Sequence, residues 1–142
     1  MNDAKMFLMK IRVYNSLIDS KLDEISHLRS LVGKVTAAYS GDTGGGSGNP
    51  DKFGDAIAKI VDLETALNAD IDTYVNVRQK AKNTIDLIPD VDQATVLYKR
   101  YFEFKKWEQI ACEMSFTYRW VLKLHGRALQ SLDLILKERK KH

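Results

Sequence analysis

The sequence predicts an all-α protein, built from a long antiparallel helical hairpin (a coiled coil) and a C-terminal module of three shorter helices. Two observations support this fold class. Two long segments repeat apolar residues at alternating steps of about three and four positions, the spacing of a helical seam. Between them lies the stretch SGDTGGGSGNP, residues 40–50, which has no apolar anchor and too many glycines to hold a helix. We expect a flexible connector at 41–50.

The first seam predicts a helix from about residue 3 to about residue 40. Its apolar positions are Phe7, Ile11, Tyr14, Ile18, Ile25, Leu28, Val32, Val35 and Tyr39. Lys21 interrupts the repeat. Four leucines widen the stripe on its flanks, namely Leu8, Leu17, Leu22 and Leu31. A stripe wider than the a/d seam indicates packing against more than one partner helix.

The second seam predicts a helix that begins at Pro50-Asp51 and ends at Pro89. Its positions are Phe53, Ile57, Ile60, Leu67, Ile71, Tyr74, Ala81, Ile85 and Ile88, with Glu64 and Arg78 also on the seam. Together the two helices form the predicted first domain, residues 1–89.

An antiparallel fold-back predicts which polar seam residues meet. With the turn centred near residue 46, Lys21 should lie beside Asp70 or Ile71. Glu64 should lie near His27, Leu28 or Arg29. Polar residues in a seam commonly set its register, and a catalytic Lys–Glu pair is the alternative.

The second predicted domain, residues 90–142, has the pattern of a helix-turn-helix module. Asp92 is the expected cap of a helix with Val96, Leu97, Tyr101 and Phe102 inward, and Trp107 to Met114 forms the next, with Ile110, Ala111 and Met114 inward. After the break SFT, Thr117 can cap the third helix. Its inward positions are Val121, Leu124 or His125, Ala128, Leu129, Leu132 and Ile135. The alternative is a generic three-helix cap on the hairpin.

Charge divides unevenly between the two halves. Residues 1–93 carry a net charge of −3 and residues 94–142 carry +6. A basic C-terminal part favours a polyanionic partner. The chain has no run of about 18 apolar residues and no signal-peptide pattern at its start. Its single cysteine excludes an internal disulfide. We therefore expect a cytoplasmic protein that does not enter a membrane.

No catalytic, metal-binding or cofactor-binding pattern is present. His27, His125 and His142 lie far apart in the sequence and lack the spacing of metal ligands on a helix. The glycine-rich stretch lacks the Gly-Lys-Ser/Thr sequence of a phosphate-binding loop. Cys112 lies among small apolar neighbours, so we expect a buried core thiol. The sequence thus predicts no enzyme, no cofactor and no metal site.

The segment VLYKRYFEFKKWEQIACEMSFTYRWVLKLHGRALQSL resembles region 4 of sigma-70-type factors. The matching residues are Leu97, Arg100, Tyr101, Phe102, Glu103, Ile110, Ala111, Val121, Arg127, Ala128, Leu129 and Leu132. With the segments KIRVYNSLIDSKLDEISHLRSL and KIVDLETALNADIDTYV, the chain resembles small phage and prophage proteins related to the ArpU and RinA transcriptional regulators. This resemblance implies a regulator of late phage genes.

The sequence departs from the sigma pattern in three respects. Lys106 occupies the cap position of the second helix, where Ser or Thr is usual, and Ser115 occupies a turn position often filled by Gly. The segment of sigma factors that melts promoter DNA is absent. The resemblance therefore implies a −35-type reading module joined to a coil, with RNA polymerase as a further candidate partner.

The third helix is expected to read double-stranded DNA in the major groove. Its outward residues are Tyr118, Arg119, Leu122 and Lys123, with Trp120 partly outward. Arg119 can pair with a guanine edge, whereas Lys123 and Arg127 should lie nearer to phosphates. In the sigma-like pattern Arg127 can also tie helix to helix. Residues expected to contact the phosphate backbone of the DNA are Lys99, Arg100, Lys105 and Lys106. Trp120 can pack under the module, contact a thymine methyl group or meet a partner protein.

A homodimer is the expected assembly, because the flanking leucines exceed what one partner helix covers and one recognition helix reads few base pairs. Two other functions remain open at this point. The hairpin could act in phage packaging or assembly, with the C-terminal module only docking, or the chain could be a structural coiled-coil protein.

Overall fold

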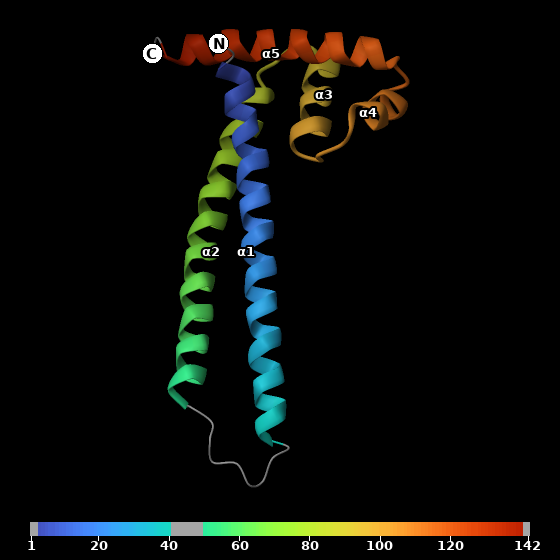
Figure 1. Cartoon of the computed structure of the whole chain (residues 1–142). Coiled ribbons are helices and arrows are strands. Elements are labelled where there is room, and N and C mark those ends of the chain that lie inside the picture. The colour runs from blue at the N-terminus through green and yellow to red at the C-terminus, as the bar shows by residue number, and fades with distance from the viewer. Residues whose placement is uncertain (1–2, 41–49, 141–142) are drawn as a thin grey trace. The chain divides into compact units, whose positions relative to one another are not determined.

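The structure is a computed structural model that describes the backbone of residues 3–40 and 50–140 and the side chains of residues 3–34 and 52–140. All regular elements in these residues are α-helices, which confirms the predicted all-α class (Figure 1). They are α1 (Asp3–Ser40), α2 (Pro50–Ile85), α3 (Val91–Tyr101), α4 (Trp107–Met114) and α5 (Tyr118–Lys140). The expected flexible connector at 41–50 lies outside the described residues, apart from Pro50.

The chain divides into two compact units. Unit 1 consists of Met1–Tyr14 and Tyr74–His142, and unit 2 consists of Asn15–Thr73. Unit 1 thus joins α3, α4 and α5 with the start of α1 and the end of α2. Unit 2 holds the remainder of α1 and α2. Each unit has its own cluster of buried apolar side chains.

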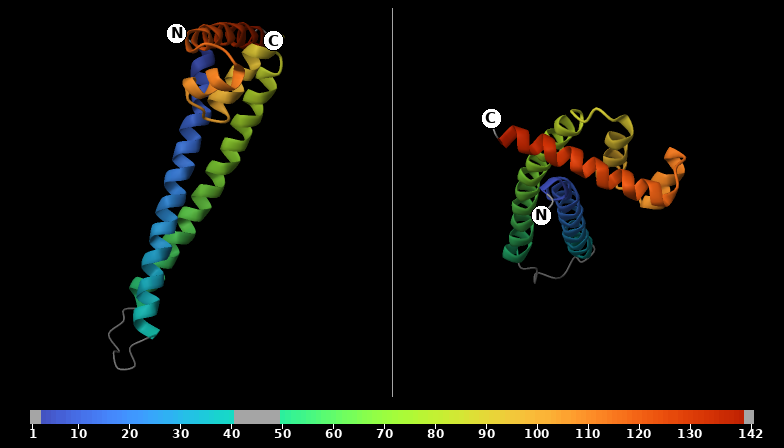
Figure 2. Two further views of the ribbon diagram at one scale, coloured as in Figure 1. Left: turned by 90° about the vertical axis from the view of Figure 1, so that its right-hand side faces the viewer. Right: turned by 90° about the horizontal axis from the view of Figure 1, so that it is seen from above.

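In unit 2, α1 and α2 lie side by side and run in opposite directions (Figures 1 and 2). Ile25, Ile60 and Leu67 are buried between them. The partly buried residues around this cluster are Ile18, Leu28, Val32, Leu63 and Ile71. Most of these positions belong to the two predicted seams, because apolar residues spaced at three and four positions fall on one face of a helix.

The polar seam residues of unit 2 pair as the antiparallel register predicts. Lys21 forms an ion pair with Asp70, and Arg29 forms one with Glu64. Both pairs are partly open to solvent. Such pairs contribute little net stability, but they disfavour a shifted register that would leave either charge without its partner.

Unit 1 is organised around α5, which crosses the start of α1 and the end of α2 (Figure 2). The Asp133 carboxylate accepts a 2.7 Å hydrogen bond from the backbone N–H of Ala4. Arg139 donates to the buried Thr84 hydroxyl at 2.9 Å. Leu8, expected on the flank of the hairpin seam, is fully buried in this core. It belongs to the same buried cluster as residues of α2, α3, α4 and α5.

The α2–α3 connection differs from the prediction in where α2 ends and in which residue caps α3. α2 ends at Ile85, and the N–H groups of Leu87 and Ile88 bond to carbonyls only three residues back, at 3.1 and 2.9 Å. The residue before a proline avoids helical conformation, so the helix ends ahead of Pro89. The prediction that Asp92 caps α3 was wrong. The cap is Asp90, whose carboxylate accepts a hydrogen bond from the Gln93 N–H at 3.0 Å.

The cap can be tested by substitution. Asp90→Ala should remove the only side-chain acceptor for this N–H group and cost about 1 kcal/mol, seen as a Tm lowered by roughly 3–5 °C. Asp92→Ala is the matched control, because Asp92 lies in the first turn of α3 and is exposed. Equal losses in the two variants, measured by thermal melting, would contradict the assignment of the cap.

Candidate nucleic-acid interface

The break between α4 and α5 is a tight turn built on a left-handed serine. Ser115 has φ 58° and ψ 38°, and the N–H of Phe116 bonds to the Ala111 carbonyl at 2.9 Å. Glycine adopts this conformation without strain, so serine here raises the energy of the turn. The Thr117 hydroxyl accepts from the Trp120 N–H at 3.1 Å, which confirms the predicted cap of α5.

Small and apolar residues bring α4 against α5. Ile110 and Ala111 are buried, and Met114 is half-buried, as predicted. On α5 the buried residues are Val121, Leu124, Ala128, Leu129 and Leu132. This inner stripe leaves the opposite side of α5 free to face outward (Figure 1).

The start of α4 is held by an arginine instead of a cap. Lys106, at the cap position, makes no side-chain hydrogen bond to the helix end, as expected from its residue type. The Arg100 guanidinium lies 4.3 Å from the centre of the Trp107 ring and donates to the Lys105 carbonyl at 2.9 Å. This cation–π contact and hydrogen bond fix the α3–α4 loop. Arg100 is therefore largely engaged within the protein.

His125 is packed between aromatic rings of α3 and α4. Its Nε2 lies 2.8 Å from the Tyr101 hydroxyl, and its ring meets the Trp107 ring edge to face at 4.6 Å. Burial lowers the pKa of His125 to about 4, and the positive charges of Arg100 and Lys5 act in the same direction. The imidazole is therefore neutral at physiological pH. A neutral imidazole has one nitrogen that donates and one that accepts, and the Tyr101 hydroxyl can take the complementary role toward Nε2 in either tautomer.

The outer face of α5 is basic along its N-terminal half. Arg119, Lys123 and Arg127 are exposed, as are Tyr118 and Leu122. Residues 118–132 contain no Asp or Glu. Among the described residues neither Arg119 nor Lys123 has a carboxylate partner. The structure thus places three of the predicted DNA-contact cations on one helix without neutralisation.

Trp120 and Arg127 form a stack on the side of this face. The Arg127 guanidinium lies 5.0 Å from the centre of the Trp120 ring, and Phe116 packs edge to face on the same ring at 6.5 Å. Trp120 is half-buried. Arg127 therefore contacts a residue of its own helix, seven positions earlier, while its side chain stays accessible.

The lysines of the α3–α4 loop differ in availability. Glu113 on α4 accepts from Lys105 at 2.5 Å and from Lys99 at 3.0 Å. The hydrogen bonds from Lys105 and then Lys99 lower the pKa of Glu113. Lys105 also lies 3.3 Å from Glu103. Lys106 is exposed, and no described carboxylate pairs with it.

Cys112 corrects the prediction of a buried thiol, because its side chain is exposed. α4 is too short to be covered on all sides. Its inner face is already filled by Ile110, Ala111 and Met114, and the next position around the helix points outward. The helical periodicity of the eight residues of α4 could have shown that Cys112 faces outward.

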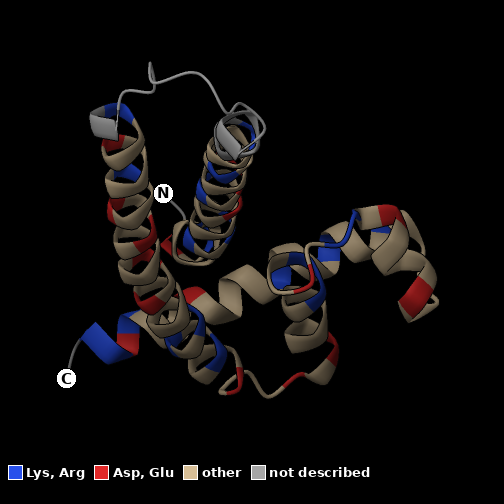
Figure 3. Cartoon of the chain, turned by 90° about the horizontal axis from the view of Figure 1, so that it is seen from below, with Lys and Arg blue, Asp and Glu red and all other residues tan. Residues whose placement is uncertain are grey.

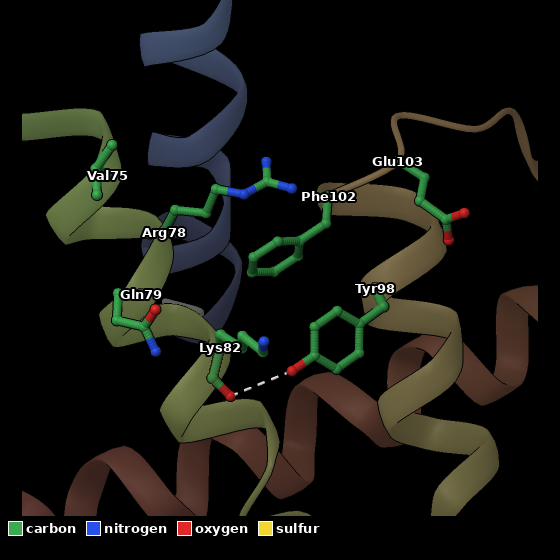
Figure 4. Close-up of a pocket in the computed structure, with 7 residues that line it drawn as sticks. All are labelled: Val75, Arg78, Gln79, Lys82, Tyr98, Phe102 and Glu103. Atoms are coloured by element: carbon green, nitrogen blue, oxygen red, sulfur yellow. Dashed lines mark hydrogen bonds between the residues drawn. The ribbon is translucent and has the colours of Figure 1, made fainter. Parts of the chain in front are cut away.

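A shallow groove lies between the end of α2 and α3 (Figure 4). Arg78 sits 4.8 Å from the centre of the Phe102 ring and donates to the Tyr74 hydroxyl at 3.0 Å. The Tyr98 hydroxyl donates to Asp86 at 2.6 Å, and burial together with this bond raises the pKa of Tyr98. These contacts tie α3 to α2. The groove brings together no nucleophile and base that could form a catalytic set.

Within the described part of the chain, no three His, Cys, Asp or Glu side chains come together to form a metal site. None of the described helices is long and apolar enough to cross a membrane.

The neutral, packed state of His125 predicts a pH effect on stability. The unfolded chain binds a proton near pH 6.5, whereas the folded chain binds it near pH 4. Stability should therefore be full above about pH 6.5 and fall as the pH drops toward 4, by roughly 1–2 kcal/mol after allowance for solvent screening. His125→Gln should flatten this part of the profile of urea midpoint against pH. His27→Gln, at an exposed position, is the matched control, and an unchanged slope in His125→Gln would contradict the assignment.

No family model, no curated protein and no solved structure matches the chain. The chemistry of the residues described above is therefore what supports a function.

Proposed function

We propose that this protein binds double-stranded DNA sequence-specifically and regulates transcription of phage or prophage genes, with α5 as the reading helix. The observation that carries this proposal is the outer face of α5. It presents Arg119, Lys123 and Arg127, and no acidic residue occurs in residues 118–132. A face of this kind attracts phosphates and releases counterions on binding. A solvated structural helix commonly alternates charges of both signs.

The α4–turn–α5 arrangement suits entry of one helix into the major groove. The N-terminal part of a recognition helix meets base edges while the preceding helix lies across the backbone. Arg119, the second residue of α5, can pair two donors with a guanine. Lys123 lies one turn later and reaches phosphates as the straight helix leaves the curved groove. Tyr118 and Leu122 offer contacts with sugars and thymine methyl groups.

Contacts within the protein indicate which other basic side chains are available to bind DNA. Lys106 is exposed at the start of α4 and is available to a phosphate. Lys105 forms an ion pair with Glu113 in the free protein, so its charge is less available to a phosphate. Arg127 reaches DNA from its position over Trp120. We therefore rank Lys106 above Lys105 as a backbone contact.

The resemblance to sigma-70 region 4 and to the ArpU and RinA regulators supports the transcriptional part of the proposal. The residues that carry it include buried members of unit 1, such as Leu97, Ile110 and Val121. RNA polymerase is a further partner that this resemblance implies. A packaging adaptor that does not engage DNA, or a structural coiled-coil protein, would not show steeply salt-dependent binding to a duplex.

Arg119 and Lys123 should affect DNA binding in different ways. On a site selected from random duplexes, Arg119→Ala should cost about 1–3 kcal/mol and have little effect on scrambled DNA. Lys123→Ala should weaken both duplexes equally and reduce the slope of log K against log salt by about one unit. The measurement is fluorescence anisotropy at several salt concentrations, with Lys10→Ala as an exposed control on α1.

Two results would count against this assignment. If Arg119→Ala weakens selected and scrambled DNA by the same factor, α5 does not read sequence through Arg119. If the unmodified protein binds neither duplex with a salt-dependent affinity, the DNA-binding function itself is wrong.

We propose further that the protein acts as a homodimer. Leu8 is buried within its own chain, but Leu17, Leu22 and Leu31 remain exposed on α1, at 40%, 48% and 43%. Leu17 follows the exposed Val13 by four positions on α1, so exposed apolar side chains adjoin there, and adjoining exposed apolar side chains favour a partner surface. Sedimentation at tens of micromolar should show a dimer that Leu22→Gln weakens, and a strict monomer would refute the proposal.

A further inference from the structure

Gly126 stands in the middle of α5 at a position where the fold has no need of a glycine. It is exposed, and a Cβ atom added there would meet nothing within 4 Å. Its backbone is ordinary right-handed helix, since none of the described glycines has a positive φ. An exposed glycine in a helix interior lowers stability relative to alanine. Neither packing nor backbone geometry within the described chain offsets this cost.

Helical spacing places Gly126 on the basic outer face. It follows Arg119 by seven residues, Leu122 by four and Lys123 by three, which are the intervals that bring side chains onto one side of a helix. All of these residues are exposed. The position without a side chain thus lies among the residues proposed to meet DNA, and directly before Arg127.

We propose that Gly126 is a positioning residue that lets the sugar–phosphate backbone of the duplex pass directly against α5. The inference rests on the proposed DNA-binding function. A Cβ atom projects about 1.5 Å from Cα, so any other residue would hold the duplex back by about that distance. At that separation Lys123 and Arg127 would lose direct phosphate contacts, which are short and directional. The glycine therefore serves the complex and not the free protein.

The test separates stability from binding. Gly126→Ala should raise the Tm of the free protein by roughly 2–5 °C, because alanine favours the helix. The same variant should bind the selected duplex about tenfold more weakly, the effect of losing one good contact. Gly126→Leu, with a larger side chain, should bind more weakly still. Binding is measured by anisotropy with the full chain and a labelled duplex selected from a random pool.

The chain offers two matched controls. Gly33 on α1 and Gly54 on α2 are also exposed helical glycines, and a Cβ at either would meet nothing within 4 Å. Gly33→Ala and Gly54→Ala should raise the Tm without changing the affinity for DNA. The inference then rests on a loss specific to Gly126 among three changes of the same chemistry.

Each remaining outcome decides against the inference. Binding by Gly126→Ala equal to that of the unmodified protein overturns it while leaving the DNA-binding proposal intact. A lower Tm in Gly126→Ala overturns it as well, because the glycine would then serve the fold. So does a loss of dimer in sedimentation with DNA affinity per dimer retained, since the face would then receive a second copy of the chain. If the unmodified protein fails to bind any duplex, the proposed function fails first.

Discussion

The architecture of unit 1 depends on the buried stripe of α5. Val121, Ala128 and Leu132 are fully buried, and they pack in one core with residues from every other helix of the unit. α4 has only eight residues and α3 eleven, lengths at which an isolated helix is marginal in water. Both therefore owe their stability to the surface that α5 provides. The same burial determines which side of α5 faces outward.

The rigid length of α5 has a second consequence. Its N-terminal half carries the outward cations, and its C-terminal half contacts Ala4 through Asp133 and Thr84 through Arg139. One continuous helix thus connects the proposed reading face with the ends of α1 and α2. The proposed reading face and these contacts therefore lie on one helix, with no loop between them.

Contacts within the protein engage part of the basic side chains of the C-terminal module, so the cations left without a partner occupy a smaller part of its surface. Many cations of the C-terminal part are engaged: Lys99 and Lys105 with Glu113, and Arg100 with Trp107. Basic and acidic residues are interspersed along α1 and α2, whereas the last turns of α5 are largely basic (Figure 3). Among the described residues, the cations on the outer face of α5 have no carboxylate partner. Localised charge of this kind matters more for a polyanionic partner than net charge does.

Sequence periodicity predicted the helices and the register of unit 2 well, because seams and polar interruptions are local signals. The bounds of α4 and the pairing of Lys21 with Asp70 follow from spacing alone. Periodicity does not show which other element covers a flank. Leu8 is buried in a cluster that also holds residues of α3, α4 and α5, which no local pattern could indicate. The choice of Asp90 over Asp92 as a cap, and the engagement of Lys105 by Glu113, likewise depend on backbone direction and on tertiary neighbours. Cys112 was the exception, since helical spacing alone could have placed it outward.

Several departures from local preference lie in the module for which the function is proposed. Phe104 and Ser115 are the two non-glycine residues with positive φ in the described chain, and both flank α4. α4 begins without a side-chain cap, at Lys106. In the same module, Gly126 occupies an exposed helix interior that would favour another residue. Each departure costs stability, and strain of this kind persists where the surrounding fold over-determines it and function requires it. Position 115 has a conformation that suits glycine but carries serine. The helix interior at position 126 suits other residues but carries glycine. The stability of the free protein does not explain Gly126, whereas the proposed approach of a duplex at this position does.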